Sequence, residues 1–172
     1  LPDWITASGP ATGSGSAAVT LAVAHNSGEP RSTQIAVAGI TVTVSQASDV
    51  LLVNAGGVVN AASYTAPVAP GSIISAFGNF LQSDSLSVSS FPIPTDLGGL
   101  SLQFSGAPPA PLFYAGAGQV NAQVPWELAG QSQITITATL DGRTSAPQEV
   151  GLATFAPGIF TISGGGTGQG AI

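Results

Sequence analysis

The side chains able to perform acid–base or nucleophilic chemistry are few and scattered. His25 is the only histidine; it lies in the turn-like segment "HNSGEP", and no Gly-x-Ser-x-Gly motif accompanies it. The absence of cysteine and of a second histidine argues against a zinc site. The eight carboxylates occur singly, without the spacing of a calcium loop, and nothing favours a glycosidase pair. We therefore predict that the protein is not an enzyme and binds no metal or cofactor.

Neutral amide side chains are better candidates for a binding site than the ionisable groups. The segment "AGAGQVNAQVPWE" (115–127) places Gln119, Asn121 and Gln123 at alternate positions, between Val120, Ala122 and Val124. Successive side chains of a strand point to opposite faces. The segment therefore predicts a strand with an apolar face towards a core and an amide face away from it.

Two interpretations of that amide face are open. The amides could bind a sugar, with Tyr114, Trp126 or Trp4 as a stacking platform. Alternatively, the amides pair with backbone groups of a neighbouring edge or loop, Pro125 ends the strand, and Trp126 covers the end of the fold. We favour the structural interpretation. Arg31, at the end of "HNSGEPR", is likewise predicted to be structural, satisfying a turn carbonyl or pairing with an acid.

The elements that must position these residues are strands. Six segments alternate apolar and polar residues with a period of two: 17–24, 33–46, 71–77, 99–104, 118–124 and 132–140. Gly- and Pro-rich turns separate them, Asp141–Gly142 is suited to a tight hairpin, and one short turn is expected at 60–64. These features predict an all-β fold of immunoglobulin-like antiparallel sandwiches with little or no helix.

Charge is the most unusual feature of the composition. Charged residues make up only 6% of the 172 residues, Arg31 and Arg143 are the only cations, and the net charge is -6. A nucleic-acid partner is therefore excluded, because its phosphates require several cations. No apolar run approaches the roughly 18 residues of a membrane span, so membrane insertion is not expected. A weakly charged surface tolerates packing against copies of itself, because few charges lose water.

Residues 4–46 carry a resemblance to a known family. Trp4, the Gly/Ser-rich turn after it, the "HNSGEPR" turn and the closing "ITVTVSQ" resemble the BACON domain, an immunoglobulin-like sandwich of secreted bacterial proteins. The resemblance covers the second half of that domain. It implies a secreted or cell-surface location, and a role in carbohydrate binding has been proposed for the family.

Residues 58–160 resemble a second module. The motifs "APGSIISAFG", "LGGLSLQF", "APLFYAGAGQVNAQVPWE" and "APGIF" are similar, in order, to an uncharacterised module found near the ends of secreted acidobacterial proteins. The first motif also resembles the opening of IPT/TIG immunoglobulin-like domains. We predict a partial BACON-like unit at 1–47, an IPT/TIG-like sandwich at 48–156, and a Gly-rich tail or exchanged strand at 157–172.

The alternation also predicts which residues form the cores. For the first unit, the predicted core residues are Val19, Leu21, Val23, Ile35, Val37, Val42 and Val44. For the second, they are Ile73, Phe77, Leu100, Leu102, Phe104, Val120, Val124, Ile134, Ile136 and Phe155.

The favoured function is a non-enzymatic, extracellular structural protein that self-associates into a homopolymer through β-strand contacts. The alternative is a carbohydrate-binding module. The tail carries the apolar residues of a candidate exchanged strand, Ile159, Phe160, Ile162 and Ile172. A Gly-rich tail needs something to hold it, either a neighbouring copy, as in donor-strand exchange, or the surface of its own domain.

Overall fold

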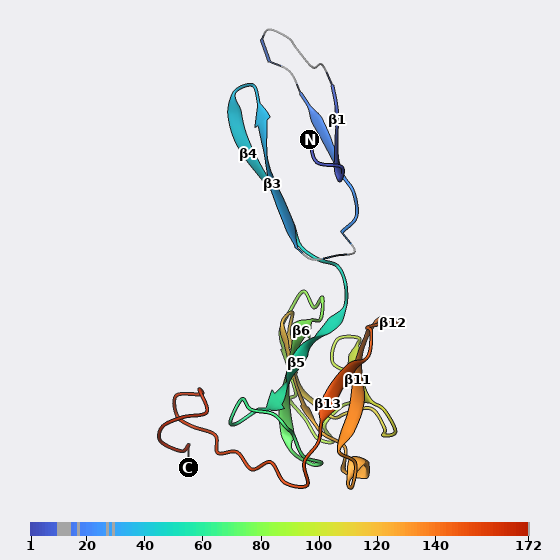
Figure 1. Cartoon of the computed structure of the whole chain (residues 1–172), viewed down its shortest axis with the longest axis vertical. Helices are drawn as coiled ribbons and strands as arrows, with labels where there is room; N and C mark the ends of the chain where they lie inside the picture. Colours follow the sequence, from blue (N-terminus) through green and yellow to red (C-terminus); the bar gives the residue numbers. More distant parts are fainter. Residues whose placement is uncertain (10–14, 17, 27, 29, 172) are drawn as a thin grey trace. The chain divides into compact units, whose positions relative to one another are not determined.

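The chain folds as two β-rich units. The computed structural model describes residues 1–9, 15–16, 18–26, 28 and 30–171. It divides into unit 1 (Leu1–Val50) and unit 2 (Leu51–Ile172) (Figure 1). The described residues contain no α-helix, and accordingly none that is long and apolar enough to cross a membrane. The predicted all-β fold with antiparallel sheets is confirmed.

Unit 1 contains two antiparallel ribbons. In the first, β1 (Ile5–Ser8) pairs with β2 (Thr20–Val23), and in the second, β3 (Arg31–Val37) pairs with β4 (Ile40–Gln46). The segment 33–46, which alternates without a break, thus contributes to two strands. Ala38 and Gly39 both adopt positive φ, 51° and 81°, and make the two-residue turn that matches the twist of a hairpin.

The core of unit 1 is smaller than predicted. Ile35 is buried, as predicted, and so is Ile5, whereas Leu21, Val37 and Val44 are only partly buried. The prediction is wrong for three valines that are 41–42% exposed: Val19, Val23 and Val42. Two of these lie directly opposite the buried isoleucines, in the pairs Ile5–Val23 and Ile35–Val42. A two-stranded ribbon offers too little surface to bury both of its own strands.

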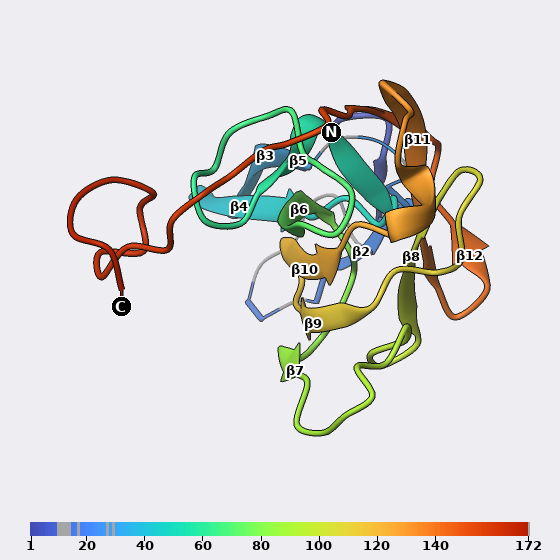
Figure 2. The ribbon, with the colours of Figure 1, turned by 90° about the horizontal axis from the view of Figure 1, so that it is seen from below.

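Unit 2 is a sandwich of two sheets. The first runs in the order β5 (Leu52–Asn60), β6 (Ile73–Asn79), β10 (Gln119–Gln123), β9 (Leu112–Ala115), β7 (Leu86–Ser87). The second contains β12 (Arg143–Thr144), β11 (Gln133–Leu140), β13 (Gln148–Gly151) and, on the other side of β11, β8 (Leu100–Phe104). Viewed from below, β6, β10, β9 and β7 form one row, with β8 and β12 beside them (Figure 2).

The inner faces of both sheets supply the core of unit 2. Of the predicted core residues, seven are buried: Leu100, Leu102, Phe104, Val120, Val124, Ile134 and Ile136. The predicted hairpin at Asp141–Gly142 is confirmed, with φ of 48° and 82° between β11 and β12. At the expected turn over 60–64, Asn60 Oδ1 accepts from the N–H of Ala62 (2.9 Å) and Ser63 (3.2 Å).

The register predicted for β6 is wrong by one residue. Ile74, Ala76 and Phe80 are fully buried, whereas Ile73 and Phe77 lie on the outer face and are only partly buried. Both faces of β6 carry apolar side chains, so its alternation does not distinguish the core side. Pairing decides it, because Ala76 lies opposite Val120 and thereby shares its inward orientation.

The sandwich ends earlier than predicted. Leu152 is the last core residue, and Phe155, predicted to be buried, is 83% exposed. The N–H of Ala153 still bonds to the carbonyl of Val68 (2.9 Å), but Phe155 follows where the chain has left the second sheet. An apolar side chain alone does not predict burial when no facing layer remains to cover it.

The tail (157–171) is held by contacts within its own chain. The N–H of Ile162 bonds to the carbonyl of Gln169 (2.9 Å), and that of Ala171 bonds to Phe160 (2.7 Å). Asn60 Nδ2 donates to the Ala156 carbonyl (2.8 Å) at the point where the tail begins. Three residues of the candidate exchanged strand, Ile159, Phe160 and Ile162, are exposed, and the fourth, Ile172, lies outside the described residues.

Candidate functional site

The outer face of the five-stranded sheet carries a cluster of neutral polar side chains. Asn121 of β10 lies opposite Ser75 of β6. The Ser75 hydroxyl (3.1 Å) and Gln119 Nε2 (2.8 Å) both donate to Asn121 Oδ1. Gln119 Nε2 also reaches Ser75 Oγ (3.3 Å). The alternation predicted for β10 places Gln119 and Asn121 on this face, the observed register of β6 adds Ser75, and mutual hydrogen bonds join the three side chains.

Gln123 and Trp126 meet farther along this face, around Gly71. Gln123 Nε2 donates to the Gly71 carbonyl (3.1 Å), the type of backbone partner that the structural interpretation expects. The Trp126 ring lies against Gly71 so closely that an added Cβ would overlap it. The ring nevertheless remains 68% exposed, and the side chain that enters the core from this turn is Leu128. Trp126 therefore lies over Gly71 but leaves most of its ring in solvent, and its predicted role as a cover of the sandwich end stays a prediction.

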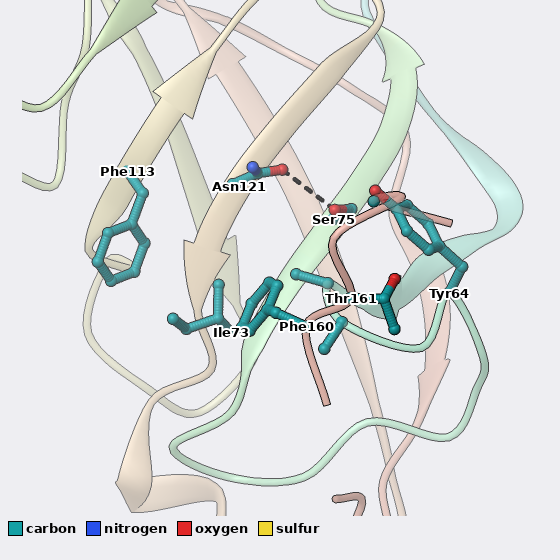
Figure 3. A pocket seen from close by; sticks show the side chains of 10 residues that line it. Tyr64, Ile73, Ser75, Phe113, Asn121, Phe160 and Thr161 are labelled. Atoms are coloured by element: carbon teal, nitrogen blue, oxygen red, sulfur yellow. Dashed lines mark hydrogen bonds between the residues drawn. The ribbon is translucent and has the colours of Figure 1, made fainter. Parts of the chain in front are cut away.

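A hollow of about 280 Å³ lies over the polar cluster. The sandwich and the tail both contribute to its lining, which consists of Ala61, Ala62, Tyr64, Ile73, Ser75, Phe113, Asn121, Phe160, Thr161 and Gly164. In the view of Figure 3, Phe113 and Tyr64 lie towards opposite sides of the hollow, with Ile73 and Phe160 between them. The hollow combines aromatic walls with an amide and hydroxyl floor.

Tyr114 shares this face but is directed to its edge. It lies opposite Asn121 in the β9–β10 pair, and its hydroxyl donates to Ser85 Oγ (3.0 Å). Gln119, Asn121 and Tyr114 are therefore neighbours, whereas Gln123 and Trp126 form a separate group around Gly71.

Trp4 and Arg31 form a structural cluster within unit 1. The guanidinium of Arg31 lies 4.5 Å from the centre of the Trp4 ring, and its Nη2 donates to the carbonyls of Ala24 (2.7 Å) and His25 (3.1 Å). Its Nε donates to Gln46 Oε1 (3.0 Å). The turn carbonyls are one of the two kinds of partner expected of Arg31. The guanidinium of Arg31 covers one face of the Trp4 ring, so that face is closed to a ligand.

The groups considered for catalysis include His25, the only histidine of the chain. His25 pairs with Asp49 at the surface, and the histidine side chain is 71% exposed. Among the described residues, no three His, Cys, Asp or Glu side chains gather where they could hold a metal ion.

Of the residues that line the hollow, sequence reasoning proposed only Asn121 and Phe160 as candidate contacts; those it missed include Tyr64, Ile73, Ser75 and Phe113. The segment "GSIISAF" does not distinguish its two faces, because each carries one serine: Ser75 lies with Ile73 and Phe77, and Ser72 with Ile74 and Ala76. No local signal marks Phe113, since the β9–β10 register shifts beside it.

Comparison with known proteins assigns one part of the chain to a domain family. Residues 2–47 match the family model of BACON, whose description reads "Putative binding domain, N-terminal". This segment is a BACON domain. The resemblance of unit 2 to IPT/TIG-like modules remains a prediction. No curated protein and no solved structure matches the chain.

Proposed function

We propose that the protein is a non-enzymatic extracellular structural subunit that self-associates through β-strand contacts between copies. The observation that carries this proposal is the uncovered apolar surface of the BACON domain. In each ribbon, one strand contributes a buried isoleucine, while the valine opposite it, Val23 or Val42, is exposed. Among the described residues, neither ribbon pairs with a third strand. Unpaired strand edges beside apolar side chains are templates for another strand.

The tail is the proposed donor of that strand. Ile159 and Ile162 are largely exposed, at 70% and 69%. Only a few backbone bonds, between 160–162 and 169–171, close the tail on itself, so intermolecular strand bonds can replace them at little net cost. A donor and an acceptor at different places on one chain give open, head-to-tail growth. The low charge supports this role, because stacking copies desolvates few ions.

The test measures the mass and shape of the assembly over a range of protein concentrations, by light scattering and negative-stain microscopy. Full-length protein should form filaments, and deletion of 158–172 should abolish them. The double variant Val23→Thr, Val42→Thr should also weaken assembly, since it makes the acceptor face polar. The matched control, Thr41→Ser with Thr43→Ser, alters the opposite face of β4 and should leave assembly unchanged. A full-length monomer at all concentrations, or filaments from the deletion, would refute the proposal.

Carbohydrate binding is the second candidate function. The description of the BACON family as a binding domain supports it, as do the uncharged amide and aromatic side chains on the outer face of unit 2. Its test is a pull-down of the intact chain on insoluble and immobilised glycans, with the exposed Phe91→Ala variant as a control. Absence of binding to every glycan tested would exclude this function.

A further inference from the structure

The hollow on the outer face of unit 2 has unused hydrogen-bonding capacity at its floor. Asn121 Oδ1 accepts from both Ser75 and Gln119, so the oxygen end of this amide is occupied. Among the described residues, Asn121 Nδ2 has no hydrogen-bond acceptor, and Gln119 Oε1 has no hydrogen-bond donor. In Figure 3 the amide oxygen of Asn121 is turned to Ser75 and the nitrogen away from it. The polar cluster thus holds a donor in a defined orientation beside the hollow.

The walls of the hollow are suited to an apolar surface. Phe113 comes from β9, Tyr64 follows β5, and Phe160 comes from the tail, so three separate segments bring aromatic rings to one place. Tyr64 is supported by Phe77, whose ring centre lies 6.5 Å away in a stacked arrangement. Aromatic rings in a site with a few oriented polar groups favour ligands that have both an apolar face and a polar rim.

The absence of charge restricts the ligand further. None of the residues lining the hollow is ionisable at neutral pH, and the two cations of the chain lie elsewhere, Arg31 in unit 1 and Arg143 on the other sheet. With a net charge of -6, the chain as a whole repels anions. A phosphate, carboxylate or sulfate group would find no counter-charge in the hollow. The ligand class that combines hydroxyl groups, an apolar C–H face and no charge is a neutral saccharide.

We propose that this hollow binds one ring of a neutral saccharide. The C–H face of the ring lies against the aromatic walls, and a ring hydroxyl accepts a hydrogen bond from Asn121 Nδ2. The volume of about 280 Å³ is just below the usual range for small-molecule pockets, so it suits a single ring better than a long chain segment. This assignment rests on the carbohydrate-binding function. It applies to a copy whose tail stays folded on unit 2, because Phe160 of the tail is one wall of the hollow.

The experiment titrates the intact chain by isothermal calorimetry with tetrasaccharides of glucose, xylose and mannose, and with an anionic tetragalacturonate. The decisive variant is Asn121→Asp, which keeps an acceptor for Ser75 and Gln119 but removes the free donor. Gln133→Glu is its control, because it makes the same change of charge at an exposed site on the other sheet. Phe113→Ala tests the wall, and Phe91→Ala, at a ring that is 87% exposed, is the matched control.

At least one neutral tetrasaccharide should bind, and the anionic one should not. Asn121→Asp and Phe113→Ala should each weaken binding about tenfold, with the melting temperature measured in parallel, whereas both controls should bind like the original chain. If a saccharide binds and both site variants bind it equally well, the site is elsewhere, and carbohydrate binding survives while this assignment fails. If no neutral saccharide binds, both fail. Tighter binding of tetragalacturonate than of any neutral sugar would also overturn the assignment.

Discussion

Replacing two phenylalanines of one strand region by alanine tests the register on which the candidate site depends. Phe80 and Phe77 lie three residues apart at the end of β6 and face opposite sides of the sheet. Phe80 is fully buried, and its backbone N–H bonds to the Ala117 carbonyl (2.8 Å). Phe77 is only partly buried and stacks on Tyr64 outside the core. The two substitutions remove the same atoms from two different environments.

The expected costs follow from this difference in burial. Phe80→Ala removes a whole ring from a closed core and should lower the free energy of unfolding by about 3–5 kcal/mol. Phe77→Ala removes a ring that already contacts water, so its cost should be about 1–2 kcal/mol, from partial burial and the lost aromatic pair. For a domain of this size, about 1 kcal/mol shifts the melting temperature by about 3–5 °C. The expected shifts are therefore about 9–25 °C for Phe80→Ala and about 3–10 °C for Phe77→Ala.

The assay must report unit 2 alone, because the chain contains two units. In a Trp4→Phe background, the only remaining tryptophan is Trp126, so its fluorescence during denaturant unfolding follows unit 2. Phe91→Ala, which removes an almost fully exposed ring, should change the free energy by less than about 0.5 kcal/mol. If Phe77→Ala costs as much as Phe80→Ala or more, the register of β6 is wrong, and the outer face described for Ser75 and Asn121 is wrong with it.

Three further substitutions test local contacts. Arg31→Lys keeps the charge but removes the planar contact with Trp4 and the bonds to two turn carbonyls, so calorimetry should show a lower melting temperature for unit 1 and an unchanged one for unit 2; equal shifts in both would contradict this. Gly71→Ala places a Cβ at a φ of 78° and displaces the Trp126 ring, so it should lower the free energy of unfolding by about 1–3 kcal/mol. It should also shift the fluorescence emission of Trp126, and an unchanged spectrum would argue against the contact. Gly142→Ala changes a residue at a φ of 82° whose added Cβ would meet no other atom, so it should lower the free energy of unfolding in urea by only about 1 kcal/mol. The emission of Trp126 should stay unchanged, and a much larger loss of stability would contradict the open surroundings of Gly142.

The local sequence pattern predicted the structure correctly where it allowed only one interpretation. Strong alternation with one apolar face predicted the inward residues of β8, β10 and β11, since a strand with one apolar face can bury only that face. Asp141–Gly142 predicted its hairpin because both residues tolerate positive φ. The amides of β10 were placed correctly on the outer face by the same reasoning, and one of them, Asn121, contributes to the floor of the candidate site.

The walls of the site were not predictable in this way. Phe113, Tyr64 and Phe160 belong to segments far apart in the chain, and nothing in their local sequence shows that they meet. The order of strands in the sheet brings β9 beside β10, and the contact of Asn60 with Ala156 brings the tail back to the end of β5. Such contacts depend on the whole arrangement of the sheets rather than on the type of each residue.

The sequence by itself determined that the protein is all-β, weakly charged and without cysteine, because composition and two-residue periodicity are properties of the chain alone. Only the tertiary structure decided which of two apolar faces of β6 is buried and that Phe155 and three valines of the first unit are exposed. It also decided that Asn121 Nδ2, which has no acceptor among the described residues, lies near aromatic rings. The physical reason is that burial requires a facing layer. Whether an apolar side chain has one depends on the segments packed against it, which can lie anywhere in the chain.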